Sequence, residues 1–135
     1  IGFAKIDDEF IDAALHDLTG SNLSTDVLLT LAANELRWMA NSRARISDWS
    51  MAALSNGAAF LIPTLPNGMC SRSMGGASKD VLSAEAAGIC ATIFLLQTLH
   101  EREGDFPQDR RRTVRRLFDF VAIHPEAEAI RSVLD

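Results

Sequence analysis

The order of apolar and polar residues predicts a chain that is helical towards both ends and extended in the middle. Close to the N-terminus, apolar residues recur at helical spacing with acidic residues on the other face, and Gly20 is placed to end this first helix. Ser24 suits the N-cap of a second helix with an apolar stripe of its own. The two stripes are Ile6, Phe10, Ile11, Ala14, Leu15 and Leu18, and then Leu29, Ala32, Ala33, Leu36, Met39 and Ala40.

Two apolar runs on either side of Asn56-Gly57 predict a β-hairpin over residues 49–63. Asn-Gly favours a type I′ turn, because that turn requires a positive φ at both of its central residues. A third strand is expected at residues 69–74. Since the three strands follow one another along the chain, we interpret them as a meander.

The C-terminal half has the pattern of two or three helices. Ser83 is a suitable N-cap for a helix that continues to Leu99 and is apolar nearly all round, so we expect it to be the central and most buried helix. The next helix opens near Pro107, and His124-Pro125 separates it from a short final helix. The apolar repeat of the penultimate helix consists of Val114, Leu117, Phe118, Val121 and Ala122.

These elements predict an α+β fold in a single domain spanning residues 1–135, with a small antiparallel sheet of about three strands flanked by about four or five helices. The composition, 47% hydrophobic and 23% charged, is ordinary for a globular protein. The apolar run at residues 84–96 is interrupted by polar residues and is shorter than the roughly twenty residues of a membrane span. The N-terminus lacks the features of a signal peptide, so we expect a cytoplasmic protein with no membrane partner.

The charge distribution bears on the possible partners. A net charge of −5 argues against a nonspecific DNA binder, which neutralises phosphates with Lys and Arg, and is too small for a DNA mimic. Arginine binds carboxylate and phosphate bidentately, so a concentrated basic patch is either a docking surface for such groups or the solvated face of a helix. Aromatic residues that could stack on bases are not interleaved with the patch, and direct nucleic-acid binding is not expected. This arginine cluster consists of Arg110, Arg111, Arg112, Arg115 and Arg116.

The residues that usually carry catalysis or bind metal form no recognisable pattern. The histidines His16, His100 and His124 are far apart, and none has a Cys, Asp or Glu at the spacing of metal ligands. Cys70 and Cys90 lack a second pair, which disfavours a zinc site or a disulfide framework. We therefore expect no enzymatic activity, cofactor or metal. A small hydrolase or transferase would require one of the two thiols to meet a histidine in space.

Three motifs in this order are similar to those of one family. The first is a Trp followed by Leu-Ser-Asn-Gly and an apolar strand ending in Pro, the second is a helix start at residues 82–88, and the third is His-Pro-Glu-Ala with a closing Ile and Leu-Asp. Over residues 49–135 the chain resembles the ArdB/KlcA-type antirestriction proteins of conjugative plasmids, phages and integrated elements. Residues 45–48 depart from the family pattern, which usually has a Tyr and a Gly pair before the Trp. The first and third motifs comprise Trp49, Leu54, Ser55, Asn56, Gly57, Phe60 and Pro63, and His124, Pro125, Glu126, Ala127, Ile130, Leu134 and Asp135.

The resemblance implies a protein that protects incoming unmodified DNA from host type I restriction, without a catalytic step, a cofactor or DNA mimicry. We expect it to contact a host protein of the restriction or DNA-processing machinery, with charge complementarity setting the choice of partner. The candidate contacts are Asn56, Glu85, His124, Glu126 and Asp135, followed by the arginine cluster.

The same residues have structural interpretations. Asn56 can shape the turn, Glu85 can complement a helix dipole, and His124 and Glu126 can form a junction between helices. Two other functions also stay open. One is a nucleic-acid-binding accessory protein that uses residues 110–116, and the other is an inhibitor of another host defence system.

Overall fold

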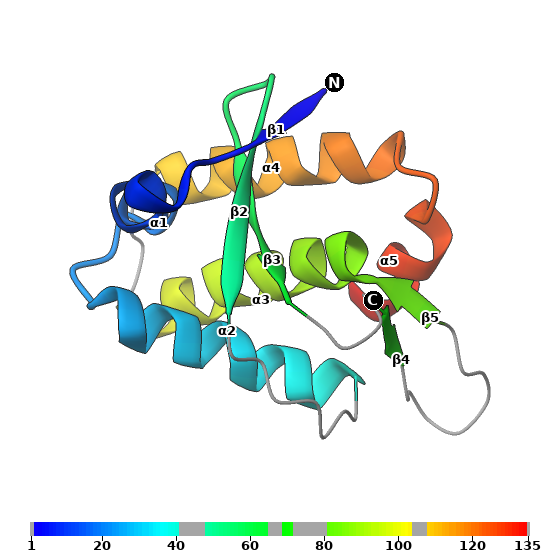
Figure 1. Ribbon diagram of the computed structural model, residues 1–135, viewed down its shortest axis with the longest axis horizontal. Helices are drawn as coiled ribbons and strands as arrows, with labels where there is room; N and C mark the ends of the chain where they lie inside the picture. Colours follow the sequence, from blue (N-terminus) through cyan, green and yellow to red (C-terminus); the bar gives the residue numbers. More distant parts are fainter. Residues whose placement is uncertain (1, 41–47, 65–68, 72–80, 104–107, 135) are drawn as a thin grey trace.

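The computed structural model describes residues 2–40, 48–64, 69–71, 81–103 and 108–134, which form helices and two small sheets (Figure 1). The helices are α1 (Ile11–Thr19), α2 (Thr25–Ala40), α3 (Ala84–Glu103), α4 (Gln108–Ala122) and α5 (Ala127–Leu134), with a short 3₁₀ helix η1 (Asp8–Phe10) before α1. The strands are β1 (Phe3–Lys5), β2 (Trp49–Leu54), β3 (Ala59–Pro63), β4 (Met69–Ser71) and β5 (Val81–Ser83).

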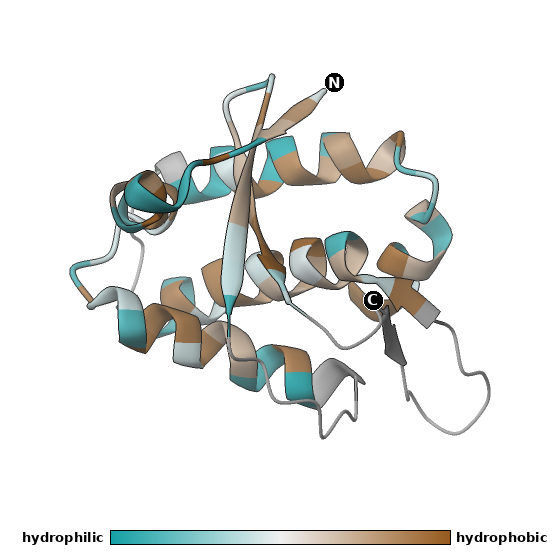
Figure 2. Ribbon diagram, in the orientation of Figure 1, coloured by the Kyte–Doolittle hydropathy of each residue, from teal (hydrophilic) through white to brown (hydrophobic). Residues whose placement is uncertain are grey.

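Helix α3 is the centre of the fold. It lies between α2 and α4, and the hairpin of β2 and β3 crosses it (Figure 1). Every residue of α3 from Ala86 to Ile93 is buried, which confirms the expectation for this helix. In Figure 2, α3 and β3 are mostly hydrophobic in colour, whereas hydrophilic residues gather on the segment that leads into α1. The apolar area buried between β3 and α3 is therefore a main source of stability, at about 25 cal/mol per Å².

The main sheet is antiparallel and has the strand order β1-β2-β3. The α+β class and the three-stranded antiparallel sheet with surrounding helices are confirmed. The strand expected at residues 69–74 is present as β4 at Met69–Ser71, and residues 72–74 lie outside the described residues. Its expected place as the third strand of this sheet is wrong, because β1 occupies that place and β4 pairs with β5 in a separate sheet. A three-residue strand is too short to show a period of two, and Ala4 pairs with Ala53, far along the chain. The local pattern could not reveal this pairing.

Helix α1 begins later than the apolar stripe indicated. Ile6 was expected inside the helix, but it precedes η1, and its N–H donates to the carbonyl of Met51 at 2.8 Å. Ile6 thereby extends the contact of β1 with the sheet. The end of α1 is as predicted, since Gly20 adopts a φ of 63° and its N–H donates to the carbonyl of His16. The hydroxyl of Ser24 caps α2, also as predicted.

The turn between β2 and β3 has three loop residues rather than two. The N–H of Gly57 donates to the carbonyl of Leu54, and the N–H of Leu54 donates to the carbonyl of Ala58, at 3.1 and 2.8 Å. The type I′ prediction is therefore wrong, because Ser55 and Asn56 are the central residues and Gly57, with a φ of 93°, follows them. The side chain of Asn56 accepts the N–H of Ala58 at 3.1 Å, a bond that the Asn-Gly pattern does not specify.

Strand β3 lies directly on α3. The hydroxyl of Thr92 accepts the N–H of Leu61 at 2.9 Å and donates to the carbonyl of Gly88 at 2.7 Å. Because β3 is an edge strand, Thr92 satisfies a backbone donor that the sheet leaves unpaired. A Cβ at Gly88 would lie 1.9 Å from the carbonyl oxygen of Leu61, so only glycine permits this approach. These contacts fix the hairpin on the helix that carries the candidate site.

Candidate partner-contact site

Three of the predicted contact residues meet at the N-terminus of α3, where the junction of α4 and α5 approaches its first turn. Nε2 of His124 lies 2.7 Å from a carboxylate oxygen of Glu85, and Nδ1 accepts the N–H of Glu126 at 3.0 Å. The Glu126 carboxylate accepts the N–H of Ser83 at 2.9 Å and the Ser83 hydroxyl at 2.5 Å. That hydroxyl in turn accepts the N–H of Ala86, which confirms Ser83 as the N-cap. We call Ser83, Glu85, His124 and Glu126 the α3 cap network.

The hydrogen bonds of the α3 cap network assign the position of the imidazole proton. Because Nδ1 of His124 accepts a backbone N–H, the proton resides on Nε2, which donates to Glu85. The side chain of His124 is 3% exposed and that of Glu85 is 28% exposed. Glu85 also lies in the first turn of α3, where the helix dipole favours a carboxylate. The structural interpretations of these residues are therefore confirmed: Glu85 complements the helix dipole of α3, and His124 and Glu126 form the junction between helices.

The arginine cluster is divided among different surroundings, and Arg110 is its buried member. Its Nε donates to the carbonyl of Thr19 and its Nη2 donates to the carboxylate of Glu103, each at 2.5 Å. The Arg110 guanidinium lowers the pKa of Glu103 below its ordinary value, burial opposes this, and the donating hydroxyl of Ser21 adds to the lowering. Arg110 thereby joins α4 to the ends of α1 and α3.

Arg116 lies over the hairpin turn. The side-chain amide of Asn56 donates to the backbone carbonyl of Arg116 at 3.0 Å. A Cβ at Gly57 would lie 2.8 Å from Nη1 of Arg116, so the guanidinium packs where that Cβ would be. The sequence predicts Asn56 and Arg116 as two separate partner contacts. In the structure they are neighbours, and together they hold the hairpin against α4.

Arg111 and Arg115 are exposed and line a groove of about 640 Å³ between α3 and α4, which we call the α3–α4 groove. Its apolar lining includes Leu96, Val114 and Phe118. Phe118 belongs to the apolar repeat of α4, yet it is 39% exposed rather than in the core. Sequence reasoning missed this groove. A signal was present, because Phe118 follows Val114 by four positions and Arg115 by three, and these spacings place apolar and basic side chains on one helix face.

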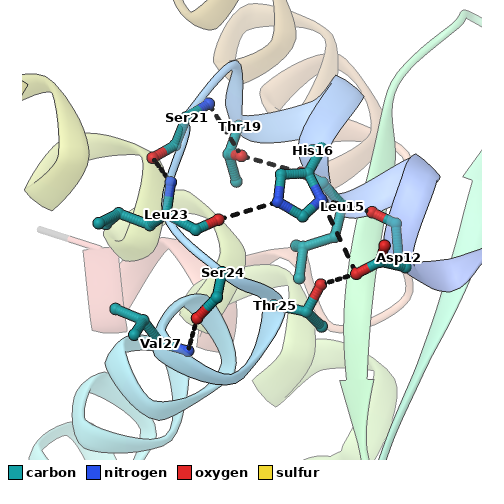
Figure 3. A network of polar contacts seen from close by, with 9 residues as sticks. All are labelled: Asp12, Leu15, His16, Thr19, Ser21, Leu23, Ser24, Thr25 and Val27. Carbon is teal, nitrogen blue, oxygen red and sulfur yellow. Dashed lines mark hydrogen bonds and ion pairs between the residues drawn. The ribbon is translucent and has the colours of Figure 1, made fainter.

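A second network that the sequence did not reveal joins α1 to the segment before α2 (Figure 3). Nδ1 of His16 lies 2.8 Å from the carbonyl oxygen of Asp12, and Nε2 lies 2.8 Å from that of Leu23. Both neighbours are acceptors, so both hydrogen bonds form together only when the ring carries two protons. The carbonyls of Asp12 and Leu23, followed by the carboxylates of Asp12 and Asp17, raise the pKa of His16 above its ordinary value of 6.5, while burial opposes them.

Among the residues that the structure describes, no group of three or more His, Cys, Asp or Glu is placed to hold a metal ion. None of the described helices is long and apolar enough to cross a membrane. Cys90 is fully buried within α3, an environment in which a thiol is inert rather than nucleophilic. The side chain of Cys70 and the whole of Asp135, a predicted contact, lie outside the described residues.

The sequence pattern of the family described as "Antirestriction protein" matches residues 45–135, more than half of the chain. The chain belongs to the antirestriction protein family. The hairpin, the α3 cap network and the α3–α4 groove all lie within the part that matches the family, whereas β1, α1 and α2 precede it. Among curated proteins, none matches the sequence.

The fold is also similar to a solved structure of the same family. The match has a TM-score of 0.82 at 27% sequence identity and covers 99% of this chain and 94% of the other. The work on that structure describes the KlcA and ArdB proteins as having a novel fold and antirestriction activity against type I DNA restriction systems in vivo but not in vitro. The similarity therefore includes the N-terminal elements that the family's sequence pattern does not match.

Proposed function

We propose that this protein is encoded by a mobile genetic element and protects incoming unmodified DNA from host type I restriction. The observation that carries the proposal is the structural similarity over nearly the whole chain to proteins described as active against type I systems. The family match rests on the sequence alone and supports antirestriction activity. The residues of the three sequence motifs lie in the hairpin, at the start of α3 and around α5, and those that are described form part of the shared fold.

We further propose a mechanism of protein contact in the cytoplasm, with no chemical step. The relatives act in vivo but not in vitro, and a direct competitor for the DNA site would inhibit a purified restriction reaction as well. A component that the cell supplies is therefore the better target, in the restriction or DNA-processing machinery. DNA mimicry is also disfavoured, because the net charge of −5 is small for a DNA mimic and α4 carries exposed basic side chains.

We assign the contact to the exposed arginines rather than to the polar motif residues. Asn56, Glu85, His124 and Glu126 are buried or half-buried, and their hydrogen bonds connect the hairpin and the helices, so their proposed role is to hold these elements in place. Arg111 and Arg115 are exposed, and arginines are well suited to meet carboxylates across an interface.

The proposed function is tested by plating unmodified phage on a strain with type I restriction that expresses the chain. The expected result is a higher plating efficiency than in the same strain without the chain. Modified phage, and a strain lacking the restriction genes, serve as controls and should show no change. Unchanged plating of the unmodified phage in cells that contain the folded protein would contradict the proposal.

The protein-contact mechanism is tested by cross-linking in restricting cells followed by purification of the chain. Retention of restriction subunits or of DNA-processing enzymes, resistant to nuclease treatment, is expected. Retention that disappears when DNA is digested would instead indicate a nucleic-acid-binding protein. An isogenic strain without the restriction genes then shows whether the partner belongs to that system.

A further inference from the structure

The α3–α4 groove has an open apolar floor. Phe118 and the half-buried Val114 on α4 form its accessible surface, over the buried Leu96 of α3. The volume of about 640 Å³ lies in the range in which proteins accommodate ligand groups or partner side chains. Phe118 exposes 39% of its surface. An accessible aromatic side chain in a groove with charged rims offers a partner a place to bury an apolar side chain of its own.

The two walls of the groove differ in charge. On the α4 wall, the exposed Arg111 and Arg115 are one helical turn apart and present two cations in a row. The α3 wall presents Gln97 and Glu101, both exposed, and the α4 wall also carries one acidic residue, Asp119, one turn after Arg115. A partner is therefore favoured in one orientation, with carboxylates towards α4 and neutral or basic groups towards α3.

The groove is also held in a fixed shape. Arg110 lies at one end of it and is bound to Glu103 and to the carbonyl of Thr19, so it anchors the start of α4 to two other helices. At the other end of α4, His124 is bound to Glu85 in the first turn of α3. Walls that are fixed before binding reduce the entropy lost when a partner docks.

We propose that the α3–α4 groove binds an amphipathic helix of a protein partner, which packs apolar side chains against Val114 and Phe118 and directs carboxylates to Arg111 and Arg115. The proposal rests on the protein-contact mechanism above and gives that contact a surface and a chemistry. Helices dock in grooves by this combination of apolar anchors and flanking charges. A nucleic acid fits less well, because its phosphates would approach Glu101 and Asp119 and would leave the apolar floor uncovered.

The test uses the purified protein and two fluorescent synthetic peptides. Each is an amphipathic helix with leucine along one face, flanked by glutamate in one peptide and by lysine in the other. We expect the glutamate peptide to bind at least about tenfold more tightly, and its affinity to fall as salt is added. Arg115→Glu should reverse the preference towards the lysine peptide, and Phe118→Ser should weaken both.

Two matched controls lie close to these positions but do not line the groove. Arg112 is exposed on the same helix, and Ile123 is an exposed apolar residue just beyond its end, at 58% exposure. Arg112→Glu and Ile123→Ser should leave both affinities unchanged. Equal binding of the two peptides, or equal losses from Arg112→Glu and Arg115→Glu, would overturn the proposal. Competition by duplex DNA that Arg115→Glu abolishes would also overturn it, in favour of a nucleic-acid site.

The phage assay separates this proposal from the function on which it rests. If the wild-type chain protects phage and folded Arg115→Glu and Phe118→Ser variants protect equally well, the groove is not the contact and the proposed function stands. If the wild-type chain gives no protection while the glutamate peptide binds as expected, the proposed function fails and the groove is a docking site for another purpose.

Discussion

His124 donates its Nε2 proton to the carboxylate of Glu85 at 2.7 Å, and this bond joins the α4–α5 junction to the first turn of α3. Glu85→Ala leaves an almost buried N–H without its acceptor, so we expect a loss of about 1–3 kcal/mol in the free energy of unfolding. Glu85→Gln should lose less, because its amide oxygen can still accept the proton. Urea denaturation measures both. The control is Glu128→Ala, which changes an exposed carboxylate in the first turn of α5, and equal stability of the two alanine variants would argue against the role of this bond.

Gly88 gives a second prediction, at the crossing of α3 and β3. In Gly88→Ala the new methyl group meets backbone atoms of Leu61 rather than a flexible side chain, with 1.9 Å to the carbonyl oxygen. Overpacking typically costs about 1–3 kcal/mol, and a backbone clash should reach or exceed the upper end of that range. Thermal unfolding and the yield of soluble protein provide the readout. Gly2→Ala, with nothing within 4 Å of its Cβ, is the control, and a Gly88→Ala protein as stable as Gly2→Ala would show that α3 and β3 can separate freely.

Gly57 is constrained in two ways that a double mutant can separate. Its φ of 93° costs an L-residue about 1–2 kcal/mol, and Arg116 occupies the space of a Cβ. We expect Gly57→Ala to be destabilising, and Arg116→Ala to restore only the part due to contact with the guanidinium. A double-mutant cycle in urea gives this coupling. If Arg116→Ala restored all of the stability lost in Gly57→Ala, the backbone conformation would contribute nothing to that loss. If it restored none, the Arg116 side chain would move aside without cost.

The pH dependence of stability should carry a contribution from His16. Its pKa is raised in the folded protein, so the doubly protonated ring stabilises the fold. This stabilisation is complete below the ordinary pKa of 6.5 and is lost as the pH rises through the higher folded-state value.

The measurement is the urea midpoint as a function of pH above and below 6.5, compared with His16→Gln, which does not titrate there. The difference between wild type and variant should shrink as the pH increases. A difference that stays constant or grows with pH would contradict the assignment of both ring nitrogens as donors.

Much of the fold follows from local patterns. Ser24 and Ser83 were recognisable as N-caps and Gly20 as the end of α1, because each depends on contacts within a few residues of the chain. The central position of α3 followed from its lack of a polar face. The third strand could not be predicted in the same way, since β1 is defined by its pairing with β2 across the intervening η1, α1 and α2.

The candidate site was predictable in its residue types but not in its arrangement. The His-Pro-Glu motif indicated a helix junction, whereas the partners of His124 and Glu126 come from the start of α3. The arginine cluster appeared as one patch in the sequence. Because successive residues of a helix point in different directions, the arginines meet different neighbours, which are distant in the chain. Arg110 is buried, Arg116 lies over the hairpin turn, and Arg111 and Arg115 line the groove.

Strand β1 has a consequence for how the protein can be divided. The segment that matches the family begins at residue 45, but β2 pairs along one edge with residues 3–5, and α2 packs against α3. A fragment starting at residue 45 would therefore expose the backbone donors and acceptors of β2 together with part of the apolar surface of α3, and such edges promote aggregation. The segment that matches the family and the segment that must fold together thus have different boundaries. Any minimal version of this protein must retain β1 and α2, which precede the family match.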